Sequence, residues 1–543
     1  MRLFDELSDD QMEELKYYIT EEYPFGPENA SRVHEVDAQR MLFNQNNVLC
    51  AEYKMSPSII VGRRGSGKTS IISNTQFFDE HSYFIKIDPE EALNYVRDAV
   101  FHDDPEREEY VEVIAKFWTL TFDAMLMAHV LQADQDHQFL SVPQFLASTN
   151  VSLGSTLSGV VQSLRKSASM IQKNLPGYLI TALLEFIESD SSNYANALDE
   201  LNKHFKRNGL SSVMILDSVE DYILKENRNK QILGGLLKCA GEYGDRRRHL
   251  RLCIPAESYF DIRSCSKNPL KDFSRNLLLQ WLPSEIYGVI AWKFMLYCRL
   301  YDEKKYEKIR RTNFSDRSSV VSVLRKILPD KITNAIGIEE PTLPYIMRHT
   351  QILPRQAIVI LNRILGHRGN TKSRWRGDEQ ERWTNVDSAA IVDGIKFCEG
   401  ILGEEIFTAF ETKYPDARAY CERCITELPR IFSNGELQIV YRRRGQSTKT
   451  VHGGYMEFDE FKTMLVEIGA IGRVRKRGSI YAEAEFEYAQ PGRLHMSVDD
   501  DLCLHPIFSG EFSSNRNDKE GLVVYPQKEW FEEESGRNLR LYT

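Results

Sequence analysis

Several features that mark common protein classes are missing from this sequence of 543 residues. Residues 1–14 show no basic start followed by an apolar stretch, so we expect no secretory signal. No apolar run approaches the roughly 20 residues of a membrane-spanning helix, so we expect no membrane association. The sequence shows no nuclease, protease or deaminase constellation and no internal repeat. These absences predict a cytoplasmic protein.

The nine cysteines do not follow a disulfide pattern. Cys239, Cys253 and Cys298 lie within apolar stretches, which is typical of buried free thiols in a reducing compartment. One CxxC pair, Cys421 and Cys424, lies on a predicted helix. A zinc site needs two more ligands at comparable spacing, and none follows closely. We therefore expect helix packing at this pair rather than zinc or redox chemistry.

Net charge and length limit the class further. A net charge of -10 argues against a protein coated with DNA-binding surface, although a local basic patch remains compatible with it. Apolar residues make up 42% and charged residues 27%, as in ordinary globular proteins. The chain is too long for one hydrophobic core, which predicts three or four domains.

Changes in hydrophobic pattern along the chain predict its domains. Short apolar strands alternate with helices at first, a pattern typical of an α/β fold with a parallel, doubly wound sheet. The Ser-rich stretch 136–176 is predicted to be a weakly patterned insertion or a mobile segment. The predicted segments are an N-terminal helical segment (1–50), the α/β core (51–282), an all-helical region (283–366), a polar linker (367–385), a helical segment (386–430) and a region of short helices and strands (431–543). Within the core, helices are predicted over 177–188 and 193–207, and the last region includes β-rich pieces such as 436–444.

A glycine-rich segment fits the pattern G-x-x-x-x-G-K-[ST] and is preceded by an apolar strand and followed by an apolar helix. Glycines let backbone N–H groups surround a phosphate without a Cβ in the way. Lysine reaches the β- and γ-phosphates, and the threonine hydroxyl binds Mg²⁺. The segment therefore predicts a site for ATP or GTP with Mg²⁺, formed by Gly62, Arg63, Arg64, Gly65, Ser66, Gly67, Lys68, Thr69 and Ser70.

A carboxylate at the end of a neighbouring strand is the second requirement of such a site. Asp217 follows four apolar residues, and we predict that it holds Mg²⁺ together with Thr69. Hydrolysis also needs a group that orients water. Ser218 occupies the next position, where an acid is usual, so Glu220 is the candidate, with Asp221 beside it. We expect slow hydrolysis.

Other polar residues at strand ends and helix starts are candidates for phosphate contacts. Glu257 follows the next strand, where it can sense the γ-phosphate, while Ser258 is equally compatible with a simple helix cap. Three arginines can neutralise transition-state charge. These are Arg275 before the last sheet strand, Arg355 at the start of a helix and Arg247, although each is also compatible with a surface role.

The segments GRRGSGKT, ILDSVED, LRLCIPAE, LLLQWLPSEI and LPRQAIVILN together resemble the AAA+/STAND branch of P-loop ATPases, especially bacterial initiator-type and KAP-type proteins. The resemblance covers about residues 50–366 and implies a P-loop NTPase sheet followed by a helical lid. It implies that Arg355 is the lid arginine that contacts the γ-phosphate. It also implies that Arg275 holds a finger-like position, directed at a neighbouring subunit of a homo-oligomer.

The C-terminal region looks like a winged helix. A helix over 459–468 is predicted to end at Gly469, and a hairpin wing follows with HPIF (505–508) as a closing core segment. Basic residues on the wing predict either phosphate contacts with DNA or a solvated hairpin in a protein-contact module. The residues concerned are Arg473, Arg475, Lys476 and Arg477.

These features favour an ATP-driven molecular switch with probable ATPase activity, in which Lys68, Asp217, Glu220 and Arg275 carry the chemistry. Similar bacterial ATPases serve in defence against phage, usually beside a separate effector protein. Two alternatives remain: a DNA-binding initiator- or motor-like ATPase, and a scaffold that uses nucleotide only for assembly.

Overall fold

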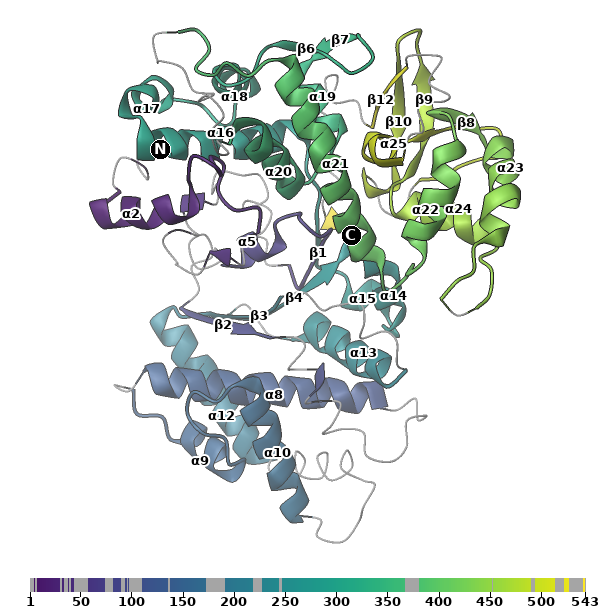
Figure 1. Ribbon diagram of the computed structural model, residues 1–543. Helices are drawn as coiled ribbons and strands as arrows, with labels where there is room; N and C mark the ends of the chain where they lie inside the picture. Colours follow the sequence, from purple (N-terminus) through teal and green to yellow (C-terminus); the bar gives the residue numbers. More distant parts are fainter. Residues whose placement is uncertain are drawn as a thin grey trace. The chain divides into compact units, whose positions relative to one another are not determined.

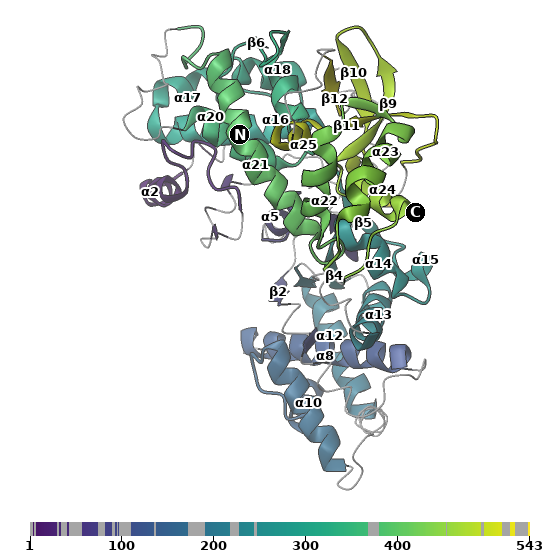
Figure 2. The same ribbon diagram turned by 45° about the vertical axis from the view of Figure 1, so that its right-hand side comes forward.

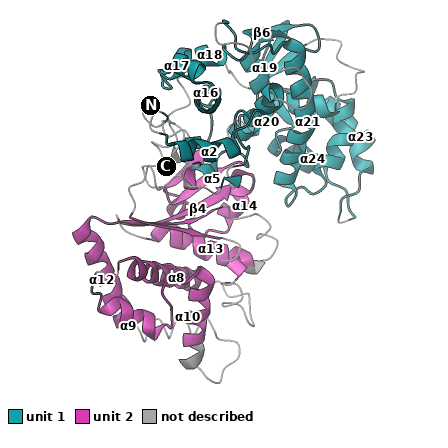
Figure 3. Ribbon diagram, turned by 60° about the vertical axis from the view of Figure 1, so that its left-hand side comes forward, with its two compact units in different colours: residues 1–48, 64–70, 280–538 teal, residues 49–63, 71–279, 539–543 magenta. Residues whose placement is uncertain are grey.

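The computed structural model describes most of the chain as two compact units (Figure 3). Unit 1 comprises Met1–Val48, Arg64–Ser70 and Gln280–Asn538, and unit 2 comprises Leu49–Arg63, Ile71–Leu279 and Leu539–Thr543. The described residues are 4, 7–29, 32–33, 38, 41–42, 57–73, 82–88, 93–94, 96, 110–134, 137–171, 191–217, 227–243, 247–366, 380–451, 453–489, 494–512, 522–526 and 541–542.

The sheet of unit 2 contains five parallel strands in the order β5-β1-β4-β3-β2, and β13 joins β5 in the antiparallel direction (Figure 1). The strands β1, β3 and β5 are rich in apolar residues and buried along their whole length, as expected of parallel strands covered on both faces. The predicted parallel sheet is thus confirmed. Its strands are β1 (Ile59–Gly62), β2 (Tyr83–Ile87), β3 (Ser212–Leu216), β4 (Arg248–Pro255), β5 (Asn276–Leu279) and β13 (Leu541–Tyr542).

Helices accompany this sheet, including two that the sequence did not predict. The Ser-rich stretch, expected to be weakly patterned, contains α9 and α10, because Phe145 and Leu164 among others bring apolar side chains onto one face. A predicted helix at 177–188 lies outside the described residues. The helices of unit 2 are α8 (Tyr110–Ala133), α9 (Ser141–Ser148), α10 (Leu157–Ile171), α12 (Ser191–Asn208), α13 (Asn227–Glu242), α14 (Tyr259–Ser264) and α15 (Pro269–Asp272).

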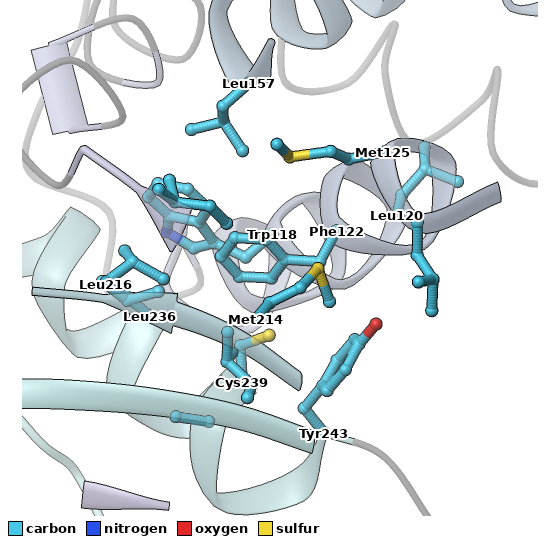
Figure 4. Packing of buried hydrophobic residues seen from close by; sticks show 14 of the residues in the cluster. Trp118, Leu120, Phe122, Met125, Leu157, Met214, Leu216, Leu236, Cys239 and Tyr243 are labelled. Carbon is cyan, nitrogen blue, oxygen red and sulfur yellow. The ribbon is translucent and has the colours of Figure 1, made fainter. Parts of the chain in front are cut away.

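Helix α8 is the centre of the unit 2 core. Trp118 and Phe122 stack at 5.3 Å and pack among Met214 of β3 and Leu236 and Cys239 of α13 (Figure 4). Residues Val111–Ala133 of this helix are long and apolar enough to cross a membrane by length and composition alone, but most of this stretch is buried inside the protein. That is the burial expected of a helix in the core of an α/β unit.

One carboxylate is buried within this apolar core. Asp123 of α8 is 1% exposed and accepts hydrogen bonds from Tyr194 (2.5 Å), Tyr243 (2.8 Å) and Arg248 (2.8 Å). Burial and the nearby carboxylate raise the pKa of Tyr243 well above its usual value, so its hydroxyl stays a donor. The cluster ties α8 to α12, to the end of α13 and to the start of β4.

The first part of unit 1 is mainly helical. Ser8 and Gln11 form a capping box that begins α2, and Asn362 of α20 binds the backbone of both Phe25 (3.0 Å) and Gly26 (2.9 Å). A short hairpin, β6–β7, interrupts the region that was predicted to contain helices only. The elements are α2 (Asp9–Tyr18), α16 (Pro283–Tyr301), α17 (Glu303–Ile309), α18 (Arg317–Leu324), β6 (Lys331–Thr333), β7 (Glu339–Pro341), α19 (Thr342–Arg348) and α20 (Pro354–Leu365).

The rest of unit 1 combines helices with a mixed sheet in the order β12-β10-β9-β11-β8. The segment 436–444 was expected to be β-rich, but it lies in α23, which begins at a capping box of Ser433 and Glu436. The elements are α21 (Ser388–Phe410), α22 (Ala417–Cys424), β8 (Ile431–Ser433), α23 (Asn434–Arg444), α24 (Phe458–Glu467), β9 (Ile471–Arg477), β10 (Tyr481–Glu485), β11 (Asp501–Leu504), α25 (Pro506–Phe512) and β12 (Val523–Tyr525).

Three other predictions for this region are confirmed: the end of α24, the β9–β10 hairpin and the burial of HPIF. Helix α24 ends near Gly469, whose φ of 75° suits a glycine after a helix. Strands β9 and β10 form the predicted hairpin, and HPIF lies in the core, with His505 fully buried. Cys421 and Cys424 are buried on α22. No group of three or more potential metal ligands occurs in the part of the chain that the structure describes.

A buried pair joins α21 to the residue that follows α19. The Nδ1 atom of His349 lies 2.9 Å from Oε1 of Glu399, and both side chains are less than 10% exposed. Burial raises the pKa of Glu399 from 4.5 to about 8 and lowers the pKa of His349 well below 6.5. The nearby charges that act on the pair belong to Arg348, Lys396, Arg430, His505 and Glu511.

We expect stability to fall between pH 6.5 and 8 because of this pair. In that window Glu399 is ionised in the unfolded chain but at least half protonated in the folded protein, while His349 is neutral in the folded protein and at most half protonated in the unfolded chain. The folded state therefore binds more protons, and rising pH costs up to about 1.4 kcal/mol per unit. Melting temperatures of the wild type and Glu399→Gln at pH 6.5 and 8 measure this effect. A pH dependence that is the same in both proteins would contradict it.

Candidate functional site

The glycine loop follows β1 and leads directly into α5 (Lys68–Ser73), as predicted. Gly65 and Gly67 have φ values of 82° and 92°, a region that side chains rarely adopt. Ser66 is fully buried, and within the described residues its hydroxyl has no hydrogen-bond partner. Lys68 is 7% exposed. The loop thus combines a backbone that only glycine fits easily with a buried hydroxyl available to a ligand.

Two side chains from outside the glycine loop contact it, one aromatic and one basic. Trp281, two residues after the end of β5, donates from Nε1 to the carbonyl of Ser66 at 2.8 Å. Arg355, the second residue of α20, lies so close that a Cβ built on Gly65 would be 3.1 Å from the Cβ of Arg355. The structure therefore brings the predicted lid arginine to the predicted phosphate loop, whereas the role of Trp281 was not predicted.

The guanidinium of Arg355 has a carboxylate partner. Its Nη1 donates to Oε1 of Glu405 on α21 at 2.6 Å, and its Nε is buried without a hydrogen-bond partner in the described part of the chain. Arg64 of the loop reaches the same helix, since its Nη1 lies 3.5 Å from the carbonyl oxygen of Thr408. Sequence reasoning missed Glu405 because no motif marks it and it lies 50 residues after Arg355.

Asp217 follows β3, and β4 separates β3 from β1 in the sheet. Leu216 pairs with Leu252, which pairs with Ile59, so Asp217 stands at the carboxyl edge of the sheet, the edge from which the glycine loop continues. Its carboxylate lies 3.8 Å from Nζ of Lys86 and is 12% exposed. This is the predicted strand-end position. Glu220 lies outside the described residues, so the structure does not place it.

Glu257 is close to the first loop residue. Its carboxylate lies 3.7 Å from Nε of Arg63, and both side chains are at most 10% exposed. Ser258 occupies the N-cap position of α14, but its side chain makes no capping hydrogen bond. The structure thus brings Glu257 to the loop, and the simple capping alternative for Ser258 lacks its hydrogen bond.

The remaining predicted arginines lie at the opposite edge of the sheet. Arg275 precedes β5 and is exposed, and its neighbour Asn276 is in register with Ile59, three residues before Gly62. At about 3.3 Å per residue, that register separates Arg275 from the end of β1 by about 13 Å. Arg247 donates to the carbonyl of Leu210 at 3.1 Å. Neither arginine reaches the loop of its own chain.

Basic residues of the predicted wing have acidic neighbours. Arg473 and Arg475 of β9 both pair with Glu485 of β10, at 2.9 and 2.5 Å, and Arg477 lies 3.9 Å from Asp501. Although burial works against ionisation, hydrogen bonds from the two arginines lower the pKa of Glu485. Much of the positive charge on this hairpin is therefore balanced within the protein.

No protein-family model matches the sequence, and no curated protein shows significant similarity to it. The function must therefore be inferred from the geometry of the site itself.

Proposed function

We propose that this protein is an AAA+/STAND-type switch that binds ATP with Mg²⁺ at the glycine loop and hydrolyses it slowly. The observation that carries the proposal is the approach of Arg355 to a loop whose glycines adopt positive φ and whose Ser66 hydroxyl is buried without a hydrogen-bond partner among the described residues. The buried Ser66 hydroxyl thus has no hydrogen-bond partner in the described part of the chain, and a bound phosphate would supply one.

Each residue has a distinct expected task. Lys68 and the loop amides bind the β- and γ-phosphates, and Arg355 binds the γ-phosphate from the lid helix α20. Thr69 and Asp217 are the candidate Mg²⁺ ligands, and carboxylate and hydroxyl oxygens are donors that suit this ion. Bound Mg²⁺ neutralises phosphate charge during transfer. Glu257 lies beside Arg63 and is a candidate for a polar contact near the phosphates.

Slow hydrolysis follows from the residue after Asp217. Ser218 has no carboxylate with which to accept a proton from water, so another group must orient the attacking water. Glu220 remains the candidate for that task. Arg275 lies too far along the sheet to serve its own loop, so its proposed role requires a neighbouring copy of the chain.

The internal pairing of the wing arginines favours the switch over a DNA-binding motor. In the switch, ATP must bind one conformation of the protein more favourably than the other by a few kcal/mol. Equal binding to both conformations would leave the equilibrium between them unchanged. A partner of the C-terminal region, such as an effector protein, would then respond to the nucleotide.

Calorimetric titration of the full chain with ATP, ADP and AMP, each with Mg²⁺, tests the proposal. We expect ATP and ADP to bind and AMP to bind far more weakly, because the loop recognises the β-phosphate, which AMP lacks. Equal affinity for AMP, or no binding of any of the three, would rule out a phosphate-binding loop. Phosphate release measured with and without DNA separates the switch from a DNA-stimulated motor.

A further inference from the structure

Arg355 lies between two elements of unit 1, the glycine loop and helix α21. Its backbone N–H approaches the carbonyl of Gly65 at 3.5 Å, and its guanidinium binds Glu405 of α21 at 2.6 Å. The Arg355 and Glu405 side chains are 29% and 26% exposed, so solvent screens their ion pair only in part. The arginine proposed to bind the γ-phosphate therefore already binds an anionic oxygen of the protein.

A second contact connects the loop with the same turn of α21. Arg64 lies 3.5 Å from the carbonyl oxygen of Thr408, which is three residues after Glu405. Phe407 in this turn packs against Phe508 and Phe512 of α25, with ring centroids 5.6 and 6.1 Å apart. Helix α21 lies beside α20 (Figure 2). The C-terminal turns of α21 thus contact the loop, the lid arginine and the C-terminal helix α25.

We infer that Glu405 competes with the γ-phosphate of ATP for Arg355 and holds the site in a state of low ATP affinity. The inference rests on the proposed function and names the group that regulates the site. A carboxylate and a phosphate that share one guanidinium repel each other, so the γ-phosphate weakens the Arg355–Glu405 pair. By linkage, the intact pair weakens ATP binding to the same extent.

This competition gives the site a preference that depends on the third phosphate. ADP has no γ-phosphate to place near Arg355, so Glu405 should oppose the binding of ATP and leave the binding of ADP nearly unchanged. When ATP separates the pair, α21 loses its contact to Arg355, and its packing against α25 can change. The carboxylate therefore connects the presence of the γ-phosphate to the C-terminal part of unit 1.

The test compares Glu405→Gln with the wild type in titrations with ATP and ADP, each with Mg²⁺. Glutamine keeps the size of the side chain and removes its charge. We expect ATP affinity to rise about tenfold, which corresponds to about 1.4 kcal/mol, and ADP affinity to stay within about twofold. Glu404→Gln is the matched control, because Glu404 precedes Glu405 on α21 and pairs with Arg418 instead. It should change neither affinity.

An Arg355→Ala background shows whether the arginine mediates the effect. Without the shared guanidinium, Glu405→Gln should raise ATP affinity by no more than about twofold, since coupled residues lose their interaction energy together. An undiminished gain in that background would overturn the competition. The competition would also be overturned if Glu405→Gln left the ATP and ADP affinities unchanged or raised both equally. In that case the proposed function would still stand, provided that the wild type binds ATP. A wild type that binds neither nucleotide would overturn both.

Discussion

Replacing Lys68 with alanine is expected to weaken binding of ATP with Mg²⁺ by about 10- to 100-fold and to abolish measurable phosphate release. A charge-assisted hydrogen bond between an ammonium and a phosphate contributes about 1.5–3 kcal/mol, and its loss accounts for a decrease of that size. Lys68 is the first residue of α5 and is 7% exposed, so its position relative to the loop is fixed by the backbone turn before it.

Lys203→Ala serves as the matched control, because it removes the same charge from an exposed position on α12, where Lys203 pairs with Asp199 one helical turn earlier. Calorimetry and phosphate release should show wild-type behaviour in this control. Thermal melting must show that the Lys68 variant remains folded. Unchanged ATP affinity in a folded Lys68→Ala protein would refute the assigned role, and equal phosphate release by wild type and variant would indicate a contaminating enzyme.

Replacing Asp123 with alanine is expected to destabilise unit 2 by about 3–5 kcal/mol, because the change leaves the buried guanidinium of Arg248 without its carboxylate. Tyr194 and Tyr243 lose their acceptor in the same step. Since Asp123 is 1% exposed, water cannot easily replace it. This is the largest effect on stability that we expect from a single side chain of the described core.

Hydrogen exchange of the α8 amides measures this destabilisation directly, because the whole chain need not unfold in one step. Exchange over residues 110–133 should be much faster in Asp123→Ala than in the wild type. Tyr194→Phe is the graded control: it removes one donor and leaves the Asp123–Arg248 pair intact, so its effect should be smaller. Equal rates of amide exchange in α8 of all three proteins would show that the buried cluster around Asp123 contributes little to the stability of unit 2.

The sheet was predictable because its strands carry strong local signals. The central strands β1 and β3 are mostly apolar runs, and Gly62 and Asp217 mark where they end. Hairpin β6–β7 has no such signal, since within Lys331–Thr333 only Ile332 is buried. Segment 436–444 was predicted to be β-rich, and that prediction was wrong, because the Ser433–Glu436 capping box begins a helix there.

The candidate site was predictable only where a local motif exists. The glycine loop has one, and the resemblance supplied Arg355, which the structure places beside Gly65. Glu405 could not be predicted, because its importance depends on how α20 and α21 pack, and packing between distant segments leaves no fixed spacing in the sequence. Trp281 could not be predicted for a different reason. It donates to a backbone carbonyl, which every residue has, so this hydrogen bond requires no particular residue type in the loop.

The hydrogen bonds of Asn362 suggest a way to follow the movement of α20. Asn362 binds the backbone of Phe25 and Gly26, and it lies two helical turns after Arg355 on α20. A rotation of α20 would therefore move the chain around Phe25 as well. A small fluorophore attached at Tyr23, which is 37% exposed, would report such a rotation from a position remote in sequence from every phosphate ligand.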